Sequence, residues 1–236
     1  MQLGLYYLIS IVAVWGLLVT HANRTATQRH RTLLILAVIN AMAYGVNWWY
    51  FYIRSDHILS VLPLQLCNLA VFLIPVALMT RKGVVMDFVF YVCGLGALVA
   101  ILIPGSDYAV TYSMMTLSFY VFHFSIFLIP LLAAVWGFHS LKPTWKSARD
   151  LSLLVLIISL TLHGFNLALN TFWNVPANYF FTMRELAAAM NPAFAFFASL
   201  IPYDYLYLSF ALPILWIYMA LIGGVMKGFN TISKSS

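Results

Sequence analysis

Charged residues are scarce in this sequence. Lys, Arg, Asp and Glu together make up 8% of the 236 residues, whereas 64% of the residues are hydrophobic. Soluble domains carry about 25% charged residues, so this composition excludes an ordinary soluble domain and is typical of a membrane protein with several spans. No polar stretch is long enough to form a separate domain, and we expect one integral membrane domain over residues 1–236.

Cysteine is also rare. The two cysteines, Cys67 and Cys93, both fall within apolar stretches. Their spacing matches neither a zinc motif nor a disulfide framework. No cofactor-binding motif is present in the sequence, and we expect no cofactor.

Apolar stretches dominate what remains. Seven of them are long enough to cross about 30 Å of hydrocarbon, which takes roughly 20 helical residues. They lie near residues 3–20, 31–53, 60–80, 85–104, 114–138, 150–172 and 205–226. Only helices and closed barrels satisfy all their backbone hydrogen bonds in lipid. The sequence therefore predicts an all-α polytopic bundle of about seven transmembrane helices.

Basic residues are distributed unevenly between the two sets of loops. The loops after the first, third and fifth spans and the C-terminal tail hold Arg24, Arg29, Arg31, Arg81, Lys82, Lys142, Lys146, Arg149, Lys227 and Lys234. The opposite loops hold Arg54 and Arg184. Because basic loops stay in the cytoplasm, this bias predicts an external N-terminus and a cytoplasmic C-terminus in the cell membrane. It also accounts for the net positive charge without a nucleic-acid partner.

Polar residues inside the spans fall on single helical faces. The third span contains Gln65, Cys67 and Asn68 within the apolar stretch 62–75. The other polar positions are Asn40, Tyr44 and Asn47 in the second span, Thr116, Tyr120 and His123 in the fifth, and Ser159, His163, Asn166 and Asn170 in the sixth. Polar groups at membrane depth usually face a bundle interior or a watery cavity. We therefore expect these faces to converge in the outer half of the bundle, with the sixth-span face meeting the third and fifth spans.

A long connection follows the sixth span. Residues 173–204 are rich in aromatic residues and include Asn178, Tyr179 and the pair Arg184 and Glu185. Such a segment is typical of a helix that lies at the membrane interface. We expect it to cover the polar cavity from the outside.

Cys67 has several interpretations. A cysteine in a membrane helix is often a small apolar filler. It is a nucleophile where histidine supplies a base and Asn, Gln or Tyr supply oxyanion donors. Together with His123 and His163 it would also make a three-ligand zinc site, although no carboxylate lies close by in the sequence to support one. His163 has a structural alternative, in which it holds helices together with Asn166 and Asn170.

Several short motifs resemble one family. The stretch from Leu64 to Phe72, the glycines of Gly94-Leu95-Gly96, the stretch from Ser118 to His123, and Asn170 with Asn178-Tyr179 resemble the YwaF-like bacterial membrane proteins and their animal relative, transmembrane protein 164. The animal member is described as an acyltransferase that remodels ether phospholipids through an acyl-enzyme on its cysteine. The resemblance implies the same roles here for Cys67 as nucleophile and His123 as base.

These lines lead to a functional hypothesis. We expect acyl transfer or hydrolysis on a membrane lipid through a cysteine thioester, with lipids as the partners. The supporting groups would be Asn68, Gln65, His163, Asn166, Asn170, Asn47, Tyr120, Asn178 and Arg184, and no metal is expected. Two alternatives stay open at this point: a small membrane subunit that captures a polar metabolite, and a scaffold whose polar faces only hold helices together. The enzyme requires Cys67 and His123 to meet in a cavity open to the outer leaflet.

Overall fold

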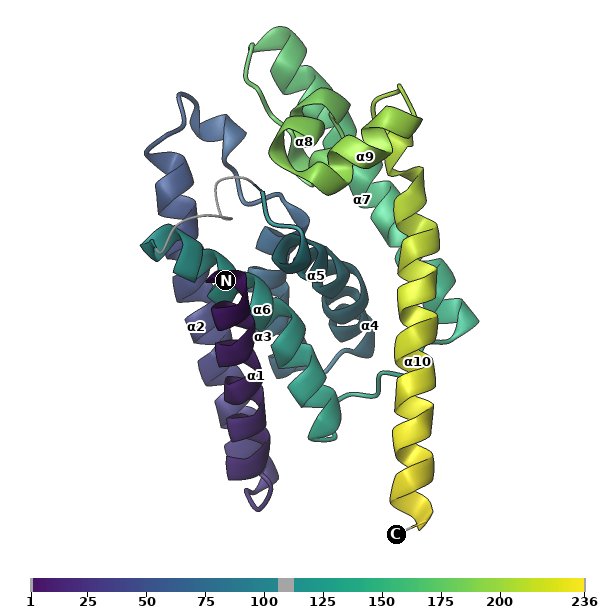
Figure 1. Cartoon of the computed structure of the whole chain (residues 1–236). Coiled ribbons are helices and arrows are strands. Elements are labelled where there is room, and N and C mark those ends of the chain that lie inside the picture. The colour runs from purple at the N-terminus through teal and green to yellow at the C-terminus, as the bar shows by residue number, and fades with distance from the viewer. Residues whose placement is uncertain (1, 106–112, 236) are drawn as a thin grey trace.

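The computed structural model describes residues 2–105 and 113–235, and every regular element in these ranges is a helix (Figure 1). The N-terminal part contains α1 (Gln2–Thr20), α2 (Ala26–Tyr52), the 3-10 helix η1 (Ile58–Ser60), α3 (Leu66–Thr80), α4 (Gly83–Asp87), the π-helix η2 (Phe88–Cys93), α5 (Gly94–Leu102) and α6 (Met114–Val135). The C-terminal part contains α7 (Trp145–Phe172), the 3-10 helix η4 (Tyr179–Phe181), α8 (Arg184–Met190), α9 (Pro192–Leu200), the 3-10 helix η5 (Leu206–Phe210) and α10 (Ala211–Ser235).

Within residues 2–105 and 113–235, five helical stretches are long and apolar enough to cross a membrane, so the prediction of a polytopic membrane bundle is confirmed. They are Ala26–Tyr52, Gly83–Leu102, Met114–Val135, Trp145–Phe172 and Leu206–Val225. The second of these combines α4, η2 and α5 into one continuous span. Two further apolar stretches, Tyr7–Thr20 of α1 and Leu66–Thr80 of α3, are shorter.

The third helix is shorter than the sequence suggested. We predicted a span from about residue 60, but α3 begins at Leu66. The backbone before it is bound by distant side chains: Trp48 Nε1 donates to Val61 O at 2.8 Å, and Leu62 N donates to the Tyr179 hydroxyl at 2.9 Å. Irregular backbone survives at membrane depth where protein groups satisfy it, which is the case here. Pro63 also lacks the N–H that a continuous helix would use.

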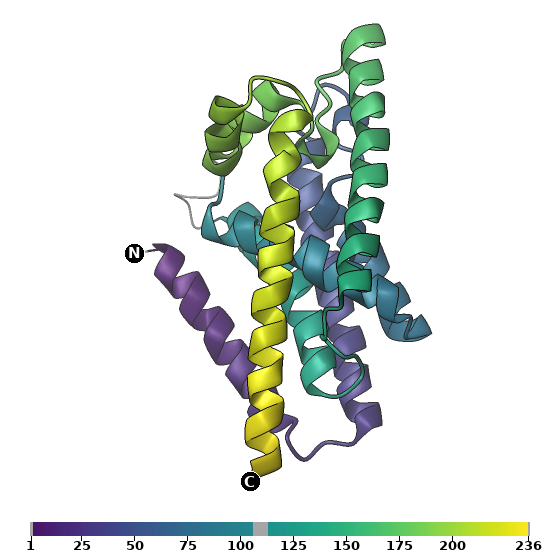
Figure 2. The ribbon, with the colours of Figure 1, turned by 90° about the vertical axis from the view of Figure 1, so that its right-hand side faces the viewer.

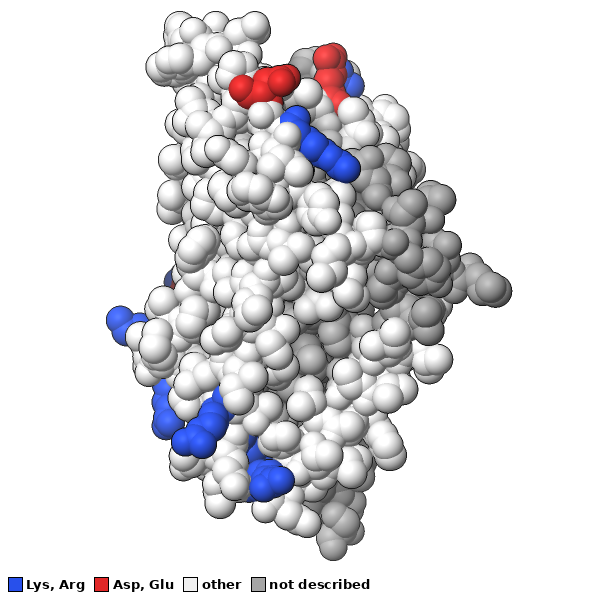
Figure 3. Space-filling view, turned by 90° about the vertical axis from the view of Figure 1, so that its left-hand side faces the viewer, with Lys and Arg blue, Asp and Glu red and all other residues white. Residues whose placement is uncertain are grey.

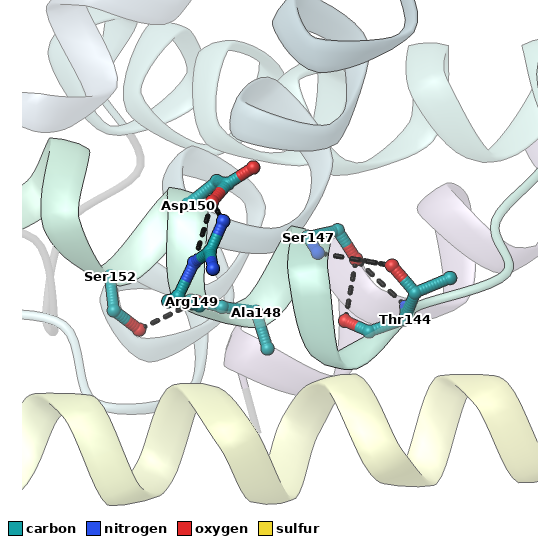
Figure 4. Close-up of polar contacts among 6 residues, drawn as sticks. All are labelled: Thr144, Ser147, Ala148, Arg149, Asp150 and Ser152. Carbon is teal, nitrogen blue, oxygen red and sulfur yellow. Dashed lines mark hydrogen bonds and ion pairs between the residues drawn. The ribbon is translucent and has the colours of Figure 1, made fainter.

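Helix starts on the basic side of the molecule are set by local capping. Thr25 and Gln28 form a capping box at α2, and Thr144 and Ser147 form another at α7 (Figure 4). Each box satisfies backbone N–H groups that have no partner within the helix. One turn into α7, the Arg149 guanidinium pairs with the neighbouring Asp150 carboxylate at 2.8 Å.

Three loops with basic residues meet at one end of the bundle, which we call the basic end. His21, after α1, stacks on Trp136, after α6, with ring centroids 5.3 Å apart. The guanidinium of Arg81, after α3, lies 6.0 Å from the centre of the Phe138 ring. Figure 3 shows most of the Lys and Arg side chains of this face toward its lower end, while the Asp and Glu side chains lie at the upper end beside other basic side chains. Each basic loop therefore lies on one side of the bundle, as the charge pattern requires.

The other end, which we call the acidic end, holds Arg54, Asp56, Arg184, Glu185 and Asp204. Here α8 and α9 gather beside the end of α7 and the start of α10, while the C-terminus lies at the far end of the molecule (Figures 1 and 2). Asn191 Nδ2 donates to Ile103 O at 2.5 Å and ties this segment to the end of α5.

The core forms around η2, whose residues are all buried. Side chains from α2, α3, α6 and α10 pack against this π-helix in one hydrophobic cluster. Single π-helical turns inside α-helices often occur at functional sites. Immediately after it, Gly96 lets α5 approach the start of α3, since a Cβ at Gly96 would lie 3.1 Å from Leu66 Cδ2.

Candidate functional site

Cys67 lies in the first turn of α3. Gln65 occupies the N-cap but makes no side-chain cap, so the first-turn N–H groups are not capped from that position. The thiol is half-buried, and its sulfur lies 3.9 Å from where a Cβ of Gly96 would be. The thiol makes no hydrogen bond to any other side chain among the described residues. Such a position places the sulfur near the N-terminal, positive end of the α3 dipole.

His123 lies on α6, and its ring is buried between Phe119 and Phe122. The ring centroids are 4.2 Å and 4.6 Å away, and the residue is 7% exposed. His123 Nδ1 lies 2.9 Å from Phe119 O. Because a carbonyl can only accept, Nδ1 is the protonated nitrogen, and a neutral ring then has an open acceptor at Nε2. Nε2 has no partner among the described residues, so it is free to act as a base.

Contacts between helices place Cys67 and His123 at similar depth. His30 Nε2 on α2 lies 3.1 Å from Leu78 O near the end of α3. Cys67 lies about three helical turns before Leu78 on α3. Because α2 runs antiparallel to α3, the position on α2 at the depth of Cys67 lies about three turns after His30, next to Asn40. Asn40 Nδ2 in turn donates to Phe122 O at 2.9 Å. Since α3 also packs against α6, the thiol and the imidazole lie on neighbouring helices at comparable depth.

The thiol and the imidazole are not hydrogen-bonded to each other in this structure. Catalytic hydrogen bonds are often long before substrate binds, so a direct contact or a water bridge stays a prediction. An apolar groove lies elsewhere, on the outer side of α2, and is lined by Met42, Gly45, Val46, Trp49 and Tyr50. It contains neither Cys67 nor His123.

The buried face of α2 adds amides that lack partners. Asn40 is 1% exposed and Asn47 is 6% exposed. Asn40 Oδ1 and Asn47 Nδ2 are both buried with no hydrogen-bond partner among the described residues. Tyr44 lies between them on the same face, with its ring 5.4 Å from that of Phe122. Asn68, half-buried in the first turn of α3, likewise makes no side-chain hydrogen bond within the described ranges.

The polar face of α7 is buried but is bound to the connection after it. Asn166 donates from Nδ2 to Tyr179 O at 2.8 Å and to Thr182 Oγ1 at 2.9 Å, and its Oδ1 accepts from Tyr179 N at 2.9 Å. His163 Nδ1 lies 3.1 Å from Thr182 Oγ1. Asn170 Nδ2 donates to Ala177 O at 2.8 Å. Within the described residues, the side-chain partners of this polar face therefore lie in the connection, and not in the third and fifth spans as we predicted.

Gln65 and Tyr179 join this network to the start of α3. Gln65 Nε2 donates to Asn178 O at 2.8 Å, and Gln65 Oε1 accepts from Phe180 N at 3.0 Å. The Tyr179 hydroxyl donates to Leu59 O at 2.5 Å. Asn178 Oδ1 accepts from Met183 N at 2.9 Å. The connection is thereby fixed against the turn that positions Cys67.

The remaining predicted site residues are spread over two elements. Tyr120 is buried on α6, with its ring edge-on to Phe119. Arg184 begins α8, with its guanidinium 3.4 Å from Glu185 and its backbone N–H bonded to Asp204 Oδ1 at 2.7 Å. It belongs to the acidic end and makes no hydrogen bond to Cys67 or His123 within the described ranges. No three His, Cys, Asp or Glu side chains of the described ranges come together, so Cys67, His123 and His163 do not form a metal site.

Sequence reasoning missed two residues that the structure places in the network. Thr182 is fully buried and serves both Asn166 and His163. Tyr205 contacts His163 through its ring, 5.2 Å away, and Ser159 through its hydroxyl, 3.2 Å away. Nothing in their local sequence marks either one, because Thr and Tyr are common in interfacial loops.

Comparison with known proteins adds one family match. Neither the curated proteins nor the solved structures contain a match. The model of the TMEM164 family matches residues 1–222. This match spans every element described above except the last part of α10, and it includes the helices of Cys67 and His123. The chain belongs to the TMEM164 family.

Proposed function

We propose that this protein is a membrane-embedded acyltransferase or acyl hydrolase that acts on a lipid through a thioester on Cys67. The observation that carries the proposal is the placement of the Cys67 thiol and the unpaired Nε2 of His123 at one depth on neighbouring helices. The family resemblance, which implies an acyl-enzyme on this cysteine, supports the same assignment.

The reaction follows from the groups at hand. His123 Nε2 takes the thiol proton, and the sulfur attacks the carbonyl carbon of a lipid ester. The C–O bond of the ester then breaks, the leaving alcohol takes the proton from His123, and the acyl group remains on sulfur. An alcohol or water next attacks the thioester and releases the acyl group. Uncapped N–H groups of the first turn of α3, with the amides of Asn68 and Asn47, are the oxyanion donors that we propose.

The α7 network has a positioning role in this proposal. His163, Asn166, Asn170, Gln65 and Asn178 are committed to hydrogen bonds that hold the connection against α3. We propose that the connection covers the site at the acidic end. Tyr120 contributes to the wall of the site on α6, and Arg184 lies where lipid headgroups approach.

The membrane topology is also part of the proposal. We propose seven spans, with α1 and the shorter α3 crossing as well, an external N-terminus and a cytoplasmic C-terminus in the cell membrane. The basic loops that meet at one end support this orientation. Reporter fusions at the tail and within residues 173–200 are expected to lie on opposite sides. If both report the same side, the seven-span topology is wrong.

The reaction class is tested by intact-protein mass spectrometry after incubation with phospholipid vesicles. A mass increase of one acyl chain is expected, and Cys67→Ala should abolish it. The partners are membrane lipids, and the proposal requires no cofactor.

A second candidate is a substrate-binding membrane subunit. The buried, unpaired amides of Asn40 and Asn47 favour it, because they offer ligand contacts that do not depend on a thiol. This candidate predicts that Cys67→Ser leaves function intact, whereas the acyl-enzyme predicts a severe loss.

A further inference from the structure

Asn40 and His123 present two hydrogen-bond acceptors at one depth in the bundle interior. Asn40 Oδ1 is buried and unpaired, while the Nδ2 of the same side chain is fixed on Phe122 O at 2.9 Å. This bond ties α2 to α6 at the residue before His123. His123 Nε2 is an acceptor because Nδ1 donates to Phe119 O. Among the described residues, no donor is bound to either atom.

The thiol supplies only one donor, and only before acylation. In the free enzyme the Cys67 S–H can donate to His123 Nε2, which leaves Asn40 Oδ1 without a partner. Once sulfur carries the acyl group, that hydrogen is gone and both acceptors are open. Buried polar atoms are nearly always paired in folded proteins, so a molecule that brings two hydrogens suits the two open acceptors of the acyl-enzyme. Water brings two, whereas the hydroxyl of an alcohol brings one.

The same face of α2 offers a polar route for water. Tyr44 and Asn47 follow Asn40 at one-turn intervals toward the acidic end, on one helical face. Neither side chain makes a hydrogen bond to another described residue, and Asn47 Nδ2 is buried. Polar groups left open at membrane depth are typical of water-filled cavities.

We propose that water is the second substrate of the site, held between Asn40 Oδ1 and His123 Nε2 and reached along Tyr44 and Asn47. One hydrogen of the water is donated to Asn40 and the other to His123. The oxygen attacks the thioester carbon, the C–S bond breaks, and the proton passes through His123 to the sulfur. The products are a carboxylic acid and the free thiol. Asn40 is a positioning residue for the water, and the inference rests on the proposed function.

The test uses the full-length protein in phospholipid nanodiscs, with p-nitrophenyl octanoate as acyl donor in water enriched in oxygen-18. The expected result is an octanoyl adduct on Cys67, followed by release of octanoate that contains one oxygen-18 atom, above the background of Cys67→Ala. A second arm adds octan-1-ol, an alcohol with a single hydroxyl. If the adduct forms but is lost only when the alcohol is present, water is not the second substrate, while the acyl-enzyme stands. If no adduct forms on Cys67, the proposed function itself fails.

Two variants locate the water. Once the adduct has formed, Asn40→Leu should lose it about tenfold more slowly than wild type, the factor that corresponds to one neutral hydrogen bond. Tyr44→Phe removes one hydroxyl and should slow the loss of the adduct by less than Asn40→Leu does. It provides a second test if Asn40→Leu does not fold. Cys93→Ala serves as the control with unchanged adduct loss. Wild-type rates of adduct loss in both Asn40→Leu and Tyr44→Phe would overturn the assignment of the water to this face.

Discussion

Two buried polar regions of this protein use the same kinds of side chain in opposite ways. Along α7, Asn166 has both amide atoms bound by residues of the connection, and His163 shares the hydroxyl of Thr182. Along α2, the amide groups of Asn40 and Asn47 are equally buried, yet Asn40 Oδ1 and Asn47 Nδ2 have no partner among the described residues.

We interpret this difference as one between polar groups that stabilise the fold and polar groups that bind a ligand. A buried amide with all its hydrogen bonds made stabilises a particular arrangement of the chain. A buried amide left open costs free energy unless something else binds it. The α7 region therefore fixes the connection, and the region between α2, α3 and α6 is where we expect a ligand. One atom departs from the pattern: Asn178 Nδ2 is unpaired within the described ranges, at the border between the two regions.

The largest effect on activity is expected in the region between α2, α3 and α6. Cys67→Ala removes the nucleophile and His123→Ala removes the base, a group that typically contributes about a hundredfold to ten-thousandfold. Both variants should lose turnover while eluting as folded protein in detergent, and Cys93→Ala should retain it. Activity is measured as release of acyl chains from a labelled phospholipid. Wild-type activity in Cys67→Ala would rule out the acyl-enzyme proposal and favour the binding subunit.

Substitutions in the polar region along α7, whose amides are hydrogen-bonded to the connection, should lower the stability of the protein. Asn166→Leu leaves the Tyr179 N–H and carbonyl without their partner, and we expect a loss of about 2–4 kcal/mol in the free energy of unfolding. The measurement is the shift of the thermal unfolding midpoint in detergent. Ser125→Ala, which removes a hydroxyl bonded to the carbonyl one turn earlier on α6, is the matched control. A midpoint equal to wild type would show that the α7 network does not stabilise the connection.

Asn47→Leu tests the unpaired amides of α2 with the same stability measurement and with turnover. The side chain makes no hydrogen bond within the described residues, so its replacement by an apolar group of similar shape should leave the unfolding midpoint unchanged or raise it. Turnover should fall about tenfold or more if Asn47 donates to the substrate. A drop in stability comparable to that of Asn166→Leu would place Asn47 among the structural groups.

The smallest effect is expected at the exposed ion pair at the start of α7. Arg149 and Asp150 are neighbours in sequence, and their side chains are 59% and 41% exposed. Exposed pairs contribute about 0–1 kcal/mol. Arg149→Gln should therefore change neither turnover nor the unfolding midpoint measurably. A clear loss in either would mean that this pair touches something beyond its own helix.

The sequence alone determined the class of the protein and the positions of its polar residues. Apolar length predicted the helices, charge bias predicted loops that do meet at one end, and helical spacing placed Asn40 and Asn47 on one face. It also made Cys67 and His123 the candidate catalytic residues, through both their chemistry and the family resemblance. These features are encoded locally, by composition and by a period of 3.6 residues, and so they can be read without coordinates.

Only the tertiary structure decided which polar groups have hydrogen-bond partners. Gln65, Asn166 and Asn47 have the same chemistry, and no local pattern states that the first two are bound while the third is open. The partner of Gln65 is the backbone of Asn178, far along the chain, and the start of α3 at Leu66 depends on Tyr179 and Trp48 in the same way. A hydrogen bond needs both partners within about 3 Å, and that distance is set by how remote segments pack rather than by the residue itself.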